Sequence, residues 1–472
     1  MKRLTNMKEY FDKAAANWRK YRKRRSYYWD SITKYCDYYI HTENSVLEVG
    51  CGTGELIGAV KGRRKVGIDF SERLIEQARK SQTTVEFRVM AAENITLDET
   101  FDVIIVSNLL CYLNDVELVF NQLHKVCHEK TRLIITSYNR TWEPLIRFAE
   151  FIGIKRKTPE LNWLSKDDIT NLLYLAGFEK YRCNSSMLFP IYIPLLSTFF
   201  NRVLSHLPFF GWFSLNDYHF ARPIPTEDGW ETKYSVSVVV PARNESGNIR
   251  AAVERIPDMG SHTEIIFVEG NSTDDTWDEI QRVAEEYRGK RDIKIMQQPG
   301  KGKGDAVRKG YSEATGDVLM ILDADLTVSP EDLPKFYKAI ATGKGEFING
   351  VRLVYPMENG AMRTLNTIGN HFFSSLFSWI LESPIKDTLC GTKVMFRTDW
   401  QRLTEGRKFF GDFDPFGDFD MLFGAYKLNL KLIDLPIRYK ERKYGTTNIS
   451  RFSHGLLLLK MSAFAAAKIR FR

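Results

Sequence analysis

The chain lacks several features that would place it in a specialised class of protein. Its six cysteines form no CxxC pair and no regular spacing, which indicates reduced thiols and argues against a disulfide framework or a zinc site. The first residues contain no apolar h-region, so no secretory signal is predicted. No window reaches about 18 uninterrupted apolar residues, the length that a spanning helix needs. Together these absences predict a cytoplasmic protein.

A strong charge of one sign is missing as well. The net charge of +8 over 472 residues suits anionic partners such as sugar nucleotides, lipid phosphates or a membrane face. It does not by itself argue for nucleic acid, and we expect no nucleic-acid partner. With 43% hydrophobic and 27% charged residues, the chain has the composition of a folded protein. Its length predicts two or three domains rather than one core.

Two stretches come closest to a membrane signal. Residues 187–213 are rich in aromatic side chains and interrupted by prolines, and residues 455–472 are apolar and then basic. Either stretch could lie in a bilayer interface. A buried helix in each domain is an equally good interpretation. The sequence leaves both open, so peripheral contact with the cytoplasmic face of a membrane is an expectation to test.

A segment rich in proline and charge divides the chain. Residues 222–233, RPIPTEDGWETK, lie between strand-like runs and are typical of a linker. On both sides, short β-rich apolar runs alternate with helical patterns, which predicts α/β domains with parallel sheets flanked by helices. We therefore expect one domain over 1–222, a linker over 223–233 and a second domain over 234–472.

The first half contains a glycine-rich turn after a predicted strand, VLEVGCGTG at 46–54. Glycine lets a backbone turn tightly and approach a ligand closely. A dinucleotide site is the obvious rival, but such sites space their glycines GxGxxG, whereas the glycines here are spaced GxGxG and follow Glu48. The next predicted strand, KVGID, ends in Asp69, whose carboxylate could accept hydrogen bonds from two ribose hydroxyls.

With AAEN at 91–94 and FDVIIVSNLL at 101–110, these motifs resemble the class I S-adenosylmethionine-dependent methyltransferases over residues 40–222. The resemblance implies a Rossmann-like sheet and the cofactor-binding residues Glu48, Gly50, Gly52, Gly54, Asp69, Glu93 and Asn108. The residues of the turn would surround the amino-acid end of the cofactor, Asp69 would hold its ribose, and Asn108 would close the pocket. Ala91 stands where the family often has an aspartate facing adenine, so that recognition would rest on backbone groups or Glu93.

A basic run from Arg19 to Arg25 lies near the start of the chain. Such runs are usually solvated helix faces. The functional alternative is a lid over the cofactor, with Tyr10, Phe11 or Tyr21 packing near it. No cysteine or histidine stands out as a base, and positioning alone can suffice for methyl transfer. The methyl acceptor stays open between a sugar, a lipid and a related compound.

In the second half, an apolar strand-like run, DVLMILDAD, ends in Asp323 and Asp325. Alternate residues of a strand point to the same side, so both carboxylates are expected to face one divalent ion at the carboxyl edge of the sheet. Hard oxygen ligands suit Mg²⁺ or Mn²⁺, which usually also bind substrate phosphates. Three segments precede this run, namely VSVVVPARNE at 236–245, EIIFVEG at 264–270 and the basic loop GKGKGDAVRKG at 300–310.

This constellation resembles the family 2 glycosyltransferases of the GT-A fold over residues 234–450. The resemblance implies the substrate-binding residues Pro241, Glu245, Glu269, Lys303 and Asp323, the first three lining the nucleobase and ribose pocket of a UDP- or GDP-sugar. Glu269 stands where the family more often has aspartate. Asp323 would face the donor and take part in catalysis. Asp325, together with Asp323, would hold the metal that neutralises the diphosphate leaving group.

Two later segments resemble the acceptor side of this family. KDTLCGTKVMF at 386–396 is similar to its acceptor segment, and GDFDML at 417–422 lies where these enzymes place an acidic general base. Asp418 or Asp420 is therefore the candidate base, although Asp418 alone could equally cap a helix. An acceptor that is already an ionised phosphate needs no base, and the carboxylate would then position it or bind metal.

Three arginines favour the polyprenol-phosphate branch of the family. Arg352 and Arg363 fall where that branch binds the lipid phosphate, and Arg442 opens RKYGTTNIS, similar to its R-x-x-G-x-S-K loop. Thr447 and Asn448 replace Ser-Lys in that loop, so a sugar on a growing glycan stays an alternative acceptor. The sequence thus predicts a bifunctional enzyme of glycan or glycolipid biosynthesis. The alternative is a glycosyltransferase whose first half is a non-catalytic cofactor-binding or docking module.

Overall fold

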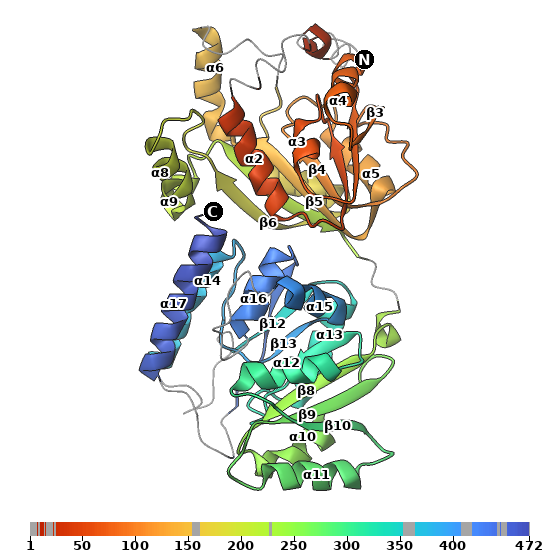
Figure 1. Ribbon diagram of the computed structural model, residues 1–472, viewed down its shortest axis with the longest axis vertical. Coiled ribbons are helices and arrows are strands. Elements are labelled where there is room, and N and C mark those ends of the chain that lie inside the picture. Colours follow the sequence, from red (N-terminus) through yellow and green to blue (C-terminus); the bar gives the residue numbers. More distant parts are fainter. Residues whose placement is uncertain are drawn as a thin grey trace. The chain divides into compact units, whose positions relative to one another are not determined.

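The structure is a computed structural model, which describes residues 7, 10–13, 15, 22, 25–152, 161–225, 229–352, 364–406, 418–440, 444 and 451–471. The chain divides into two compact units, Met1–Ile224 and Pro225–Arg470 (Figure 1). Each unit has its own sheet and its own core, and each is described here by itself.

The first unit is built on a seven-stranded sheet with the order β3-β2-β1-β4-β5-β7-β6. Its strands are β1 (Ser45–Val49), β2 (Arg64–Asp69), β3 (Glu86–Val89), β4 (Phe101–Ser107), β5 (Cys127–Tyr138), β6 (Phe178–Ser186) and β7 (Asn216–Pro223). The strands from β1 to β5 pair in parallel, whereas β7 is antiparallel to both of its neighbours. The prediction of a parallel sheet thus holds for β1 to β5 but does not extend to β7.

In the part of the first unit that the structure describes from residue 25 on, there are eight α-helices. They are α2 (Ser26–Tyr38), α3 (Glu55–Ala59), α4 (Glu72–Ser81), α5 (Val116–Leu123), α6 (Glu143–Phe151), α7 (Lys166–Leu175), α8 (Leu196–Arg202) and α9 (Pro208–Gly211). The hydroxyl of Ser71 caps α4 by accepting a hydrogen bond from the amide of Leu74 at 3.3 Å. This cap fixes the start of α4 directly after the carboxyl end of β2, where Asp69 lies.

The second unit also contains a seven-stranded sheet, with the order β10-β9-β8-β11-β13-β12-β14. Its strands are β8 (Val236–Ala242), β9 (Thr263–Glu269), β10 (Asp292–Gln297), β11 (Val318–Ile321), β12 (Phe347–Val351), β13 (Lys393–Phe396) and β14 (Leu432–Pro436). Only β13 is antiparallel, to both β11 and β12. The prediction of a parallel sheet thus holds except for this one strand, which brings the 386–396 segment to the end of β11.

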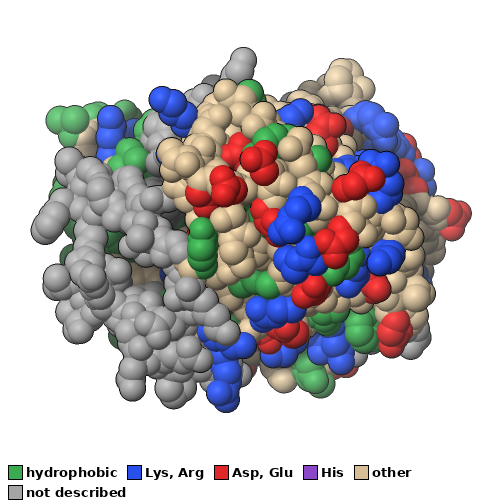
Figure 2. Space-filling model, turned by 90° about the horizontal axis from the view of Figure 1, so that it is seen from below, with side chains coloured by type: hydrophobic (Ala, Val, Ile, Leu, Met, Phe, Trp, Pro, Cys, Tyr) green, Lys and Arg blue, Asp and Glu red, His purple; other side chains and the backbone are tan. Residues whose placement is uncertain are grey.

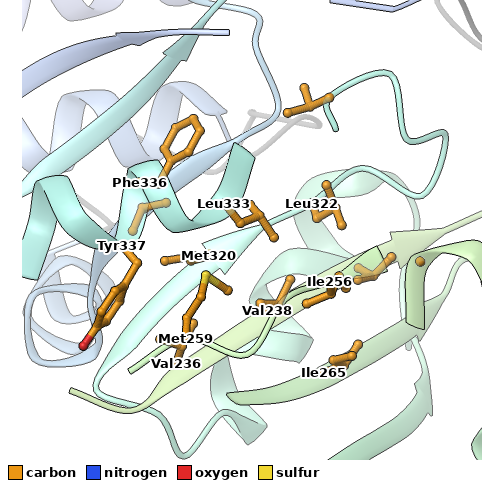
Figure 3. Packing of buried hydrophobic residues seen from close by; sticks show 14 of the residues in the cluster. Val236, Val238, Ile256, Met259, Ile265, Met320, Leu322, Leu333, Phe336 and Tyr337 are labelled. Atoms are coloured by element: carbon orange, nitrogen blue, oxygen red, sulfur yellow. The ribbon is translucent and has the colours of Figure 1, made fainter. Parts of the chain in front are cut away.

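The core of the second unit fixes the strands that carry the candidate site. Val238 of β8 and Met320 of β11 pack with Leu333 of α13 (Leu333–Ala341) in one buried cluster (Figure 3). Fully burying a side chain such as Phe336 stabilises the fold by about 1.5–3 kcal/mol. The other α-helices that the structure describes in this unit are α10 (Ile249–Arg255), α11 (Thr276–Glu286), α12 (Lys303–Glu313), α14 (Thr364–Ile380), α15 (Arg397–Gly406), α16 (Asp418–Lys427) and α17 (Arg451–Ile469).

The two apolar stretches of the sequence have different structures. Residues 187–213 form the short helices α8 and α9 with a 3-10 turn, Leu204–His206, between them, so they are not one buried helix. Residues 455–469 belong to α17, which buries Leu458, Met461 and Ala465 against its own unit. Among the helices that the structure describes, none is long and apolar enough to cross a bilayer.

Candidate functional site

The glycine-rich turn of the first unit joins β1 to α3 in a conformation that favours glycine. Gly50, Gly52 and Gly54 have φ angles of 76°, 55° and 77°, in the left-handed region. The amides of Gly50 and Cys51 both donate to the carbonyl of Ile68, at 2.8 and 3.0 Å. The turn is thereby tied to β2.

Packing gives a second reason for two of these glycines. A Cβ on Gly50 would lie 2.8 Å from a methyl group of Leu109, and one on Gly54 would lie 2.5 Å from the ring of Phe87. Both approaches are closer than van der Waals contact allows. Together with the left-handed φ angles, these approaches disfavour a side chain at 50 and 54, whatever ligand the turn approaches.

Asp69 lies at the carboxyl end of β2 beside this turn. Its Oδ2 atom accepts a hydrogen bond from the amide of Gly52 at 2.9 Å, and its Oδ1 atom accepts one from the amide of Ser71 at 2.9 Å. Burial raises the pKa of Asp69 to about 6, although both amides act in the opposite direction. Each oxygen keeps a lone pair for a further donor, so the predicted contact with two ribose hydroxyls fits.

Glu48 is buried in β1 and accepts a hydrogen bond at Oε2 from the amide of Ile57 at 3.0 Å. Burial raises the pKa of Glu48 to about 8, and the positive charge of Arg22 partly offsets this rise. Arg22 also forms an ion pair with Glu55 at 3.0 Å and stacks over Trp29. At this position, the basic run is thus a packed part of the unit rather than a solvated face.

Asn108 follows β4 in a left-handed conformation, with φ of 50°. Its Nδ2 atom donates to the hydroxyl of Tyr28 at 2.9 Å, and that hydroxyl donates to Oδ1 of Asn216 at 3.0 Å. The Oδ1 atom of Asn108 is buried and has no partner within the described part of the chain. An orphaned acceptor of this kind fits a donor group on a ligand. Tyr28 and Asn216 were not predicted, because no local motif marks them.

The N-terminal segment packs next to the carboxyl end of β2. The ring of Phe11 lies 5.8 Å from that of Phe70 and 5.1 Å from that of Tyr112. The hydroxyl of Ser71 donates to a carboxylate oxygen of Asp12 at 2.7 Å. These contacts place Phe11 beside the carboxyl end of β2, and a lid role for Tyr10 or Phe11 stays a prediction. Tyr21 lies outside the described residues. Glu93 is half-buried in the turn after β3.

In the second unit, Glu245 and Glu269 lie at the carboxyl edge of neighbouring strands. Glu269 ends β9 and accepts hydrogen bonds from the amide of Ser272 at 2.5 Å and from Gln297 at 3.2 Å. Glu245 accepts one from Asn248 at 2.7 Å. Both are buried, and Pro241 is half-buried within β8. These contacts fix the positions of the Glu245 and Glu269 side chains, whose role in a nucleotide pocket stays a prediction.

An ion pair lies at the centre of the carboxyl edge. Nζ of Lys303, the first residue of α12, is 2.6 Å from Oδ1 of Asp323. Burial alone would raise the pKa of Asp323, but Lys303 and the charges of Lys393 and Arg352 outweigh it, so the pKa lies below its ordinary value. A Cβ on Gly391 would overlap both Lys303 and the Asp323 carboxylate. Gly391 was not predicted as a site residue. In the sequence, only its position within the 386–396 segment indicates that it could belong to the site.

The paired aspartates do not continue the strand. Because β11 ends at Ile321, Asp323 and Asp325 lie in a turn, and Leu326 there has φ of 51°. The argument from alternation along a strand is therefore wrong, although both residues still lie beyond the carboxyl end of β11. Oδ1 of Asp325 accepts hydrogen bonds from the amide and hydroxyl of Thr327, at 3.0 and 2.8 Å.

The carboxylates of this turn could supply some, but not all, of the ligands that a divalent ion needs. Carboxylate oxygens are the ligands that Mg²⁺ and Mn²⁺ prefer. Within the described ranges, however, no group of three or more His, Cys, Asp or Glu residues is arranged to hold a metal. An ion at Asp325 would therefore need substrate phosphates or water as further ligands.

Arg352 forms an ion pair with Asp387. Its Nε and Nη2 atoms lie 2.7 and 2.9 Å from the two carboxylate oxygens of Asp387, and its amide donates to the same carboxylate at 3.1 Å. Asn370 donates to Asp387 as well, at 2.9 Å. Burial would raise the pKa of Asp387, but Arg352 holds it below its ordinary value. Two of the three guanidinium nitrogens of Arg352, Nε and Nη2, are therefore hydrogen-bonded to Asp387 inside the protein.

The remaining predicted residues belong to parts of the chain about which less is described. Arg363 and Arg442 lie outside the described residues. Asp418 and Asp420 lie in the first turn of α16, whose side chains are not described there. Their assignments as phosphate ligands and general base stay predictions.

Known proteins match the two halves separately. Residues 21–182 match the family model described as a methyltransferase domain, and residues 237–405 match that of glycosyl transferase family 2. A dolichol-phosphate mannosyltransferase of Pyrococcus furiosus is 38% identical over 111 residues, which cover 23% of this chain and 30% of the relative. One of Saccharomyces cerevisiae is 37% identical over 109 residues, 22% of this chain and 40% of the relative. The chain thus spans less than half of these relatives.

Solved structures resemble each half more distantly. Glucosyl-3-phosphoglycerate synthase from Mycobacterium tuberculosis aligns with a TM-score of 0.37 and 18% identity, covering 52% of this chain and 85% of the other. Magnesium protoporphyrin IX methyltransferase from Synechocystis aligns with a TM-score of 0.33 and 15% identity, covering 46% and 98%. The chain thus contains one region that matches the model of a methyltransferase domain and a second region that matches that of glycosyl transferase family 2.

Proposed function

We propose that the chain is a bifunctional transferase of glycan or glycolipid biosynthesis. The second domain would transfer a sugar from a UDP- or GDP-sugar to a polyprenyl phosphate or a glycan. The first domain would transfer a methyl group from S-adenosyl-L-methionine to a sugar, a lipid or a related acceptor. We take these domains to span residues 1–222 and 234–472, with 223–233 as the linker.

The observation that carries the sugar-transfer proposal is the ion pair of Lys303 with Asp323, against which Gly391 packs without a side chain. It brings the basic loop, the end of β11 and the acceptor-side segment to one point at the carboxyl edge of the sheet. Ligands of open α/β sheets bind beyond this edge. A nucleotide diphosphate bound there would have a lysine on one side and the Asp325 carboxylate on the other.

A divalent ion would complete this site. Asp325, with Asp323, would hold Mg²⁺ or Mn²⁺, and phosphate oxygens of the donor would supply further ligands. When bound, the ion would neutralise the diphosphate as its bond to the anomeric carbon breaks. The contacts of Thr327 with one oxygen of Asp325 would keep this carboxylate in place.

The acceptor assignment rests on the names of the relatives and on the arginines. Both mannosyltransferases are named for dolichol phosphate, which supports a polyprenyl-phosphate acceptor. A phosphate oxygen would attack the anomeric carbon, and the nucleoside diphosphate would leave with the electrons of the broken bond. Arg363 and Arg442 would bind this phosphate, whereas Arg352 would act indirectly by fixing Asp387.

A hydroxyl acceptor would need one more step. The hydroxyl of a glycan would have to lose its proton as it attacks, and Asp418 or Asp420 would accept that proton. A polyprenyl phosphate would bring the chain to a membrane, and the six free cysteines support its cytoplasmic side.

For methyl transfer, the turn at 50–54, Glu48 and Asp69 would hold the two ends of S-adenosylmethionine, and Glu93 would face adenine. The free oxygen of Asn108 would accept a hydrogen bond from the cofactor or the acceptor. The cofactor supplies an electrophilic methyl group on sulfur. A nucleophilic atom of the acceptor would take this methyl group as the carbon–sulfur bond breaks, and S-adenosylhomocysteine would leave.

Two assays on the full chain test both halves. Nucleotide sugars are screened with Mn²⁺ and dolichyl phosphate, and we expect a lipid-linked sugar that EDTA prevents from forming. Full activity in EDTA would contradict the metal-dependent mechanism, and transfer only to a glycan would assign the other acceptor. Titration with S-adenosylmethionine should show binding. Binding without methylation of any glycosylated product would favour the non-catalytic module.

A further inference from the structure

Helix α6 leaves its apolar face unpacked. None of its nine residues, all of which the structure describes, is buried. Leu145, Phe148 and Phe151 are 58%, 60% and 87% exposed. Their spacing of three residues places them on one face of the helix. These three side chains therefore contribute little to packing within their own unit.

The segment 187–213 presents apolar side chains to the solvent as well. Leu195 is 86% exposed, and Trp212 is 71% exposed. The other exposed apolar side chains of this segment are Ile191, Tyr192, Ile193, Leu196, Phe199, Val203, Leu207, Phe209 and Phe213. Leu195 also has φ of 63°, a conformation that is rare for a bulky residue. Strain of this kind is typical of functional segments.

Hydrogen bonds join these two regions into one surface. The indole Nε1 of Trp142, next to α6, donates to the carbonyl of Phe213 at 2.8 Å. The side chain of Asn139 donates to the carbonyl of Trp212 at 3.3 Å. In Figure 1, α6, α8 and α9 lie along the same side of the first unit. We call the exposed apolar side chains of α6 and of residues 187–213 the apolar patch.

The amino-acid composition of the apolar patch indicates which kind of partner could bind it. Residues 187–213 contain no acidic side chain, and Arg202 is exposed there, as is Arg140 near α6. The acidic residues of α6 itself are Glu150 and Glu143, and Glu143 forms an ion pair with Arg147. Tryptophan, tyrosine and phenylalanine with flanking arginine are typical of segments at the interface of an anionic bilayer. By contrast, Figure 2 shows a face on which acidic and basic side chains are interspersed.

We propose that the apolar patch docks the chain onto an anionic phospholipid bilayer, with α6, α8 and α9 lying in the interface. The patch supplies the aromatic and aliphatic side chains that enter the acyl boundary, and the nearby arginines attract the headgroups. This proposal rests on the exposed side chains and not on either transferase activity. A membrane-bound acceptor would meet the docked chain at the surface where it is embedded.

Flotation of the full chain with vesicles tests the proposal. Vesicles of phosphatidylglycerol are compared with vesicles of phosphatidylcholine, and the variant Phe209→Ser/Trp212→Ser is compared with the wild type. The matched control is Tyr174→Ser/Leu175→Ser, because these side chains of α7 are 68% and 56% exposed but lie outside the patch. Thermal unfolding of each variant confirms that it is folded.

We expect the wild type and the control to float with phosphatidylglycerol, and the partition coefficient of the patch variant to fall about tenfold or more. Weaker flotation with phosphatidylcholine would support the role of the arginines. Failure of the wild type to float, or equal losses in both variants, would overturn the proposal. So would self-association of the wild type that the patch variant abolishes while vesicle binding is unchanged, because the occupant would then be a second copy.

Discussion

Lys303 and Asp323 form an ion pair of 2.6 Å between the start of α12 and the turn after β11. The pair keeps Asp323 ionised and lowers its pKa against the effect of burial. It therefore holds a negative charge in a place where burial would otherwise favour the neutral acid. The neighbouring Asp325 accepts hydrogen bonds from the amide and hydroxyl of Thr327 at one of its oxygens. The two aspartates of the same turn thus have different surroundings.

The first prediction concerns Gly391, whose missing side chain leaves room for this ion pair. A Cβ added there would overlap Lys303 and the Asp323 carboxylate, and its distance to Cγ of Asp323 would be 2.7 Å. Gly391→Ala should therefore push the pair apart and reduce the kcat of sugar transfer at least tenfold. Gly406→Ala is the matched control, because a Cβ at that position meets nothing within 4 Å. Equal activity of the two variants would contradict the assignment of this point as the reaction centre.

The second prediction separates the metal role of Asp325 from its structural role. Asp325→Asn keeps an oxygen that can accept the hydrogen bonds of Thr327, so its melting temperature without metal should equal that of the wild type. The amide is a poor ligand for a hard cation compared with a carboxylate. Sugar transfer should be lost, together with the thermal stabilisation by Mn²⁺ and nucleotide. Near wild-type transfer by this variant would show that Asp325 is not a metal ligand.

The third prediction concerns Arg352 and Asp387, which form a buried bidentate pair. Removing one partner of such a pair typically costs about 3–5 kcal/mol, because the other charge is left uncompensated. Arg352→Met should therefore lower the free energy of unfolding, and Arg352→Met/Asp387→Leu should restore much of the loss. Urea denaturation measures both. If Arg352→Met left stability unchanged but raised the KM for the acceptor, the arginine would bind the acceptor phosphate directly.

The same pair has a defined pH dependence. The pKa of Asp387 in the folded state lies below its ordinary value of 3.8. The carboxylate therefore contributes stability that is fully present above this ordinary value and is lost as the pH falls through the lower folded value. Acid unfolding of Arg352→Met should consequently begin at a higher pH than that of the wild type.

The fourth prediction uses the raised pKa of Asp69, about 6. Only the ionised carboxylate accepts hydrogen bonds from ribose hydroxyls while it also accepts those of Gly52 and Ser71. The affinity for S-adenosylmethionine should therefore fall as the pH is lowered through about 6, as measured by calorimetry.

Two variants test whether this pH step belongs to Asp69. Asp69→Ala should weaken cofactor binding about tenfold or more, because a hydrogen bond to a charged group contributes about 1.5–3 kcal/mol. Asp69→Asn should remove the pH step. Glu48→Gln should keep the step, because the pKa of Glu48 is about 8. Unchanged affinity of Asp69→Ala would exclude Asp69 from the ribose site.

Local sequence patterns predicted the residues at the ends of strands. Asp69 ends β2 and Glu269 ends β9, as the apolar runs before them indicated. Patterns of this kind could not reveal partners distant in the chain. Asp387, which pairs with Arg352, is 35 residues away, and Tyr28, which contacts Asn108, is 80 residues away. The antiparallel direction of β7 and β13 could not be predicted either, because it depends on pairing with strands that are distant in the sequence.

The position of β7 in the first sheet has a consequence for synthesis. Although β7 is the last strand of its unit in the sequence, it lies between β5 and β6 and pairs with both. The nascent chain therefore cannot complete this sheet until Pro223 has left the ribosome. Before that, β5 and β6 each have an open edge that could pair wrongly.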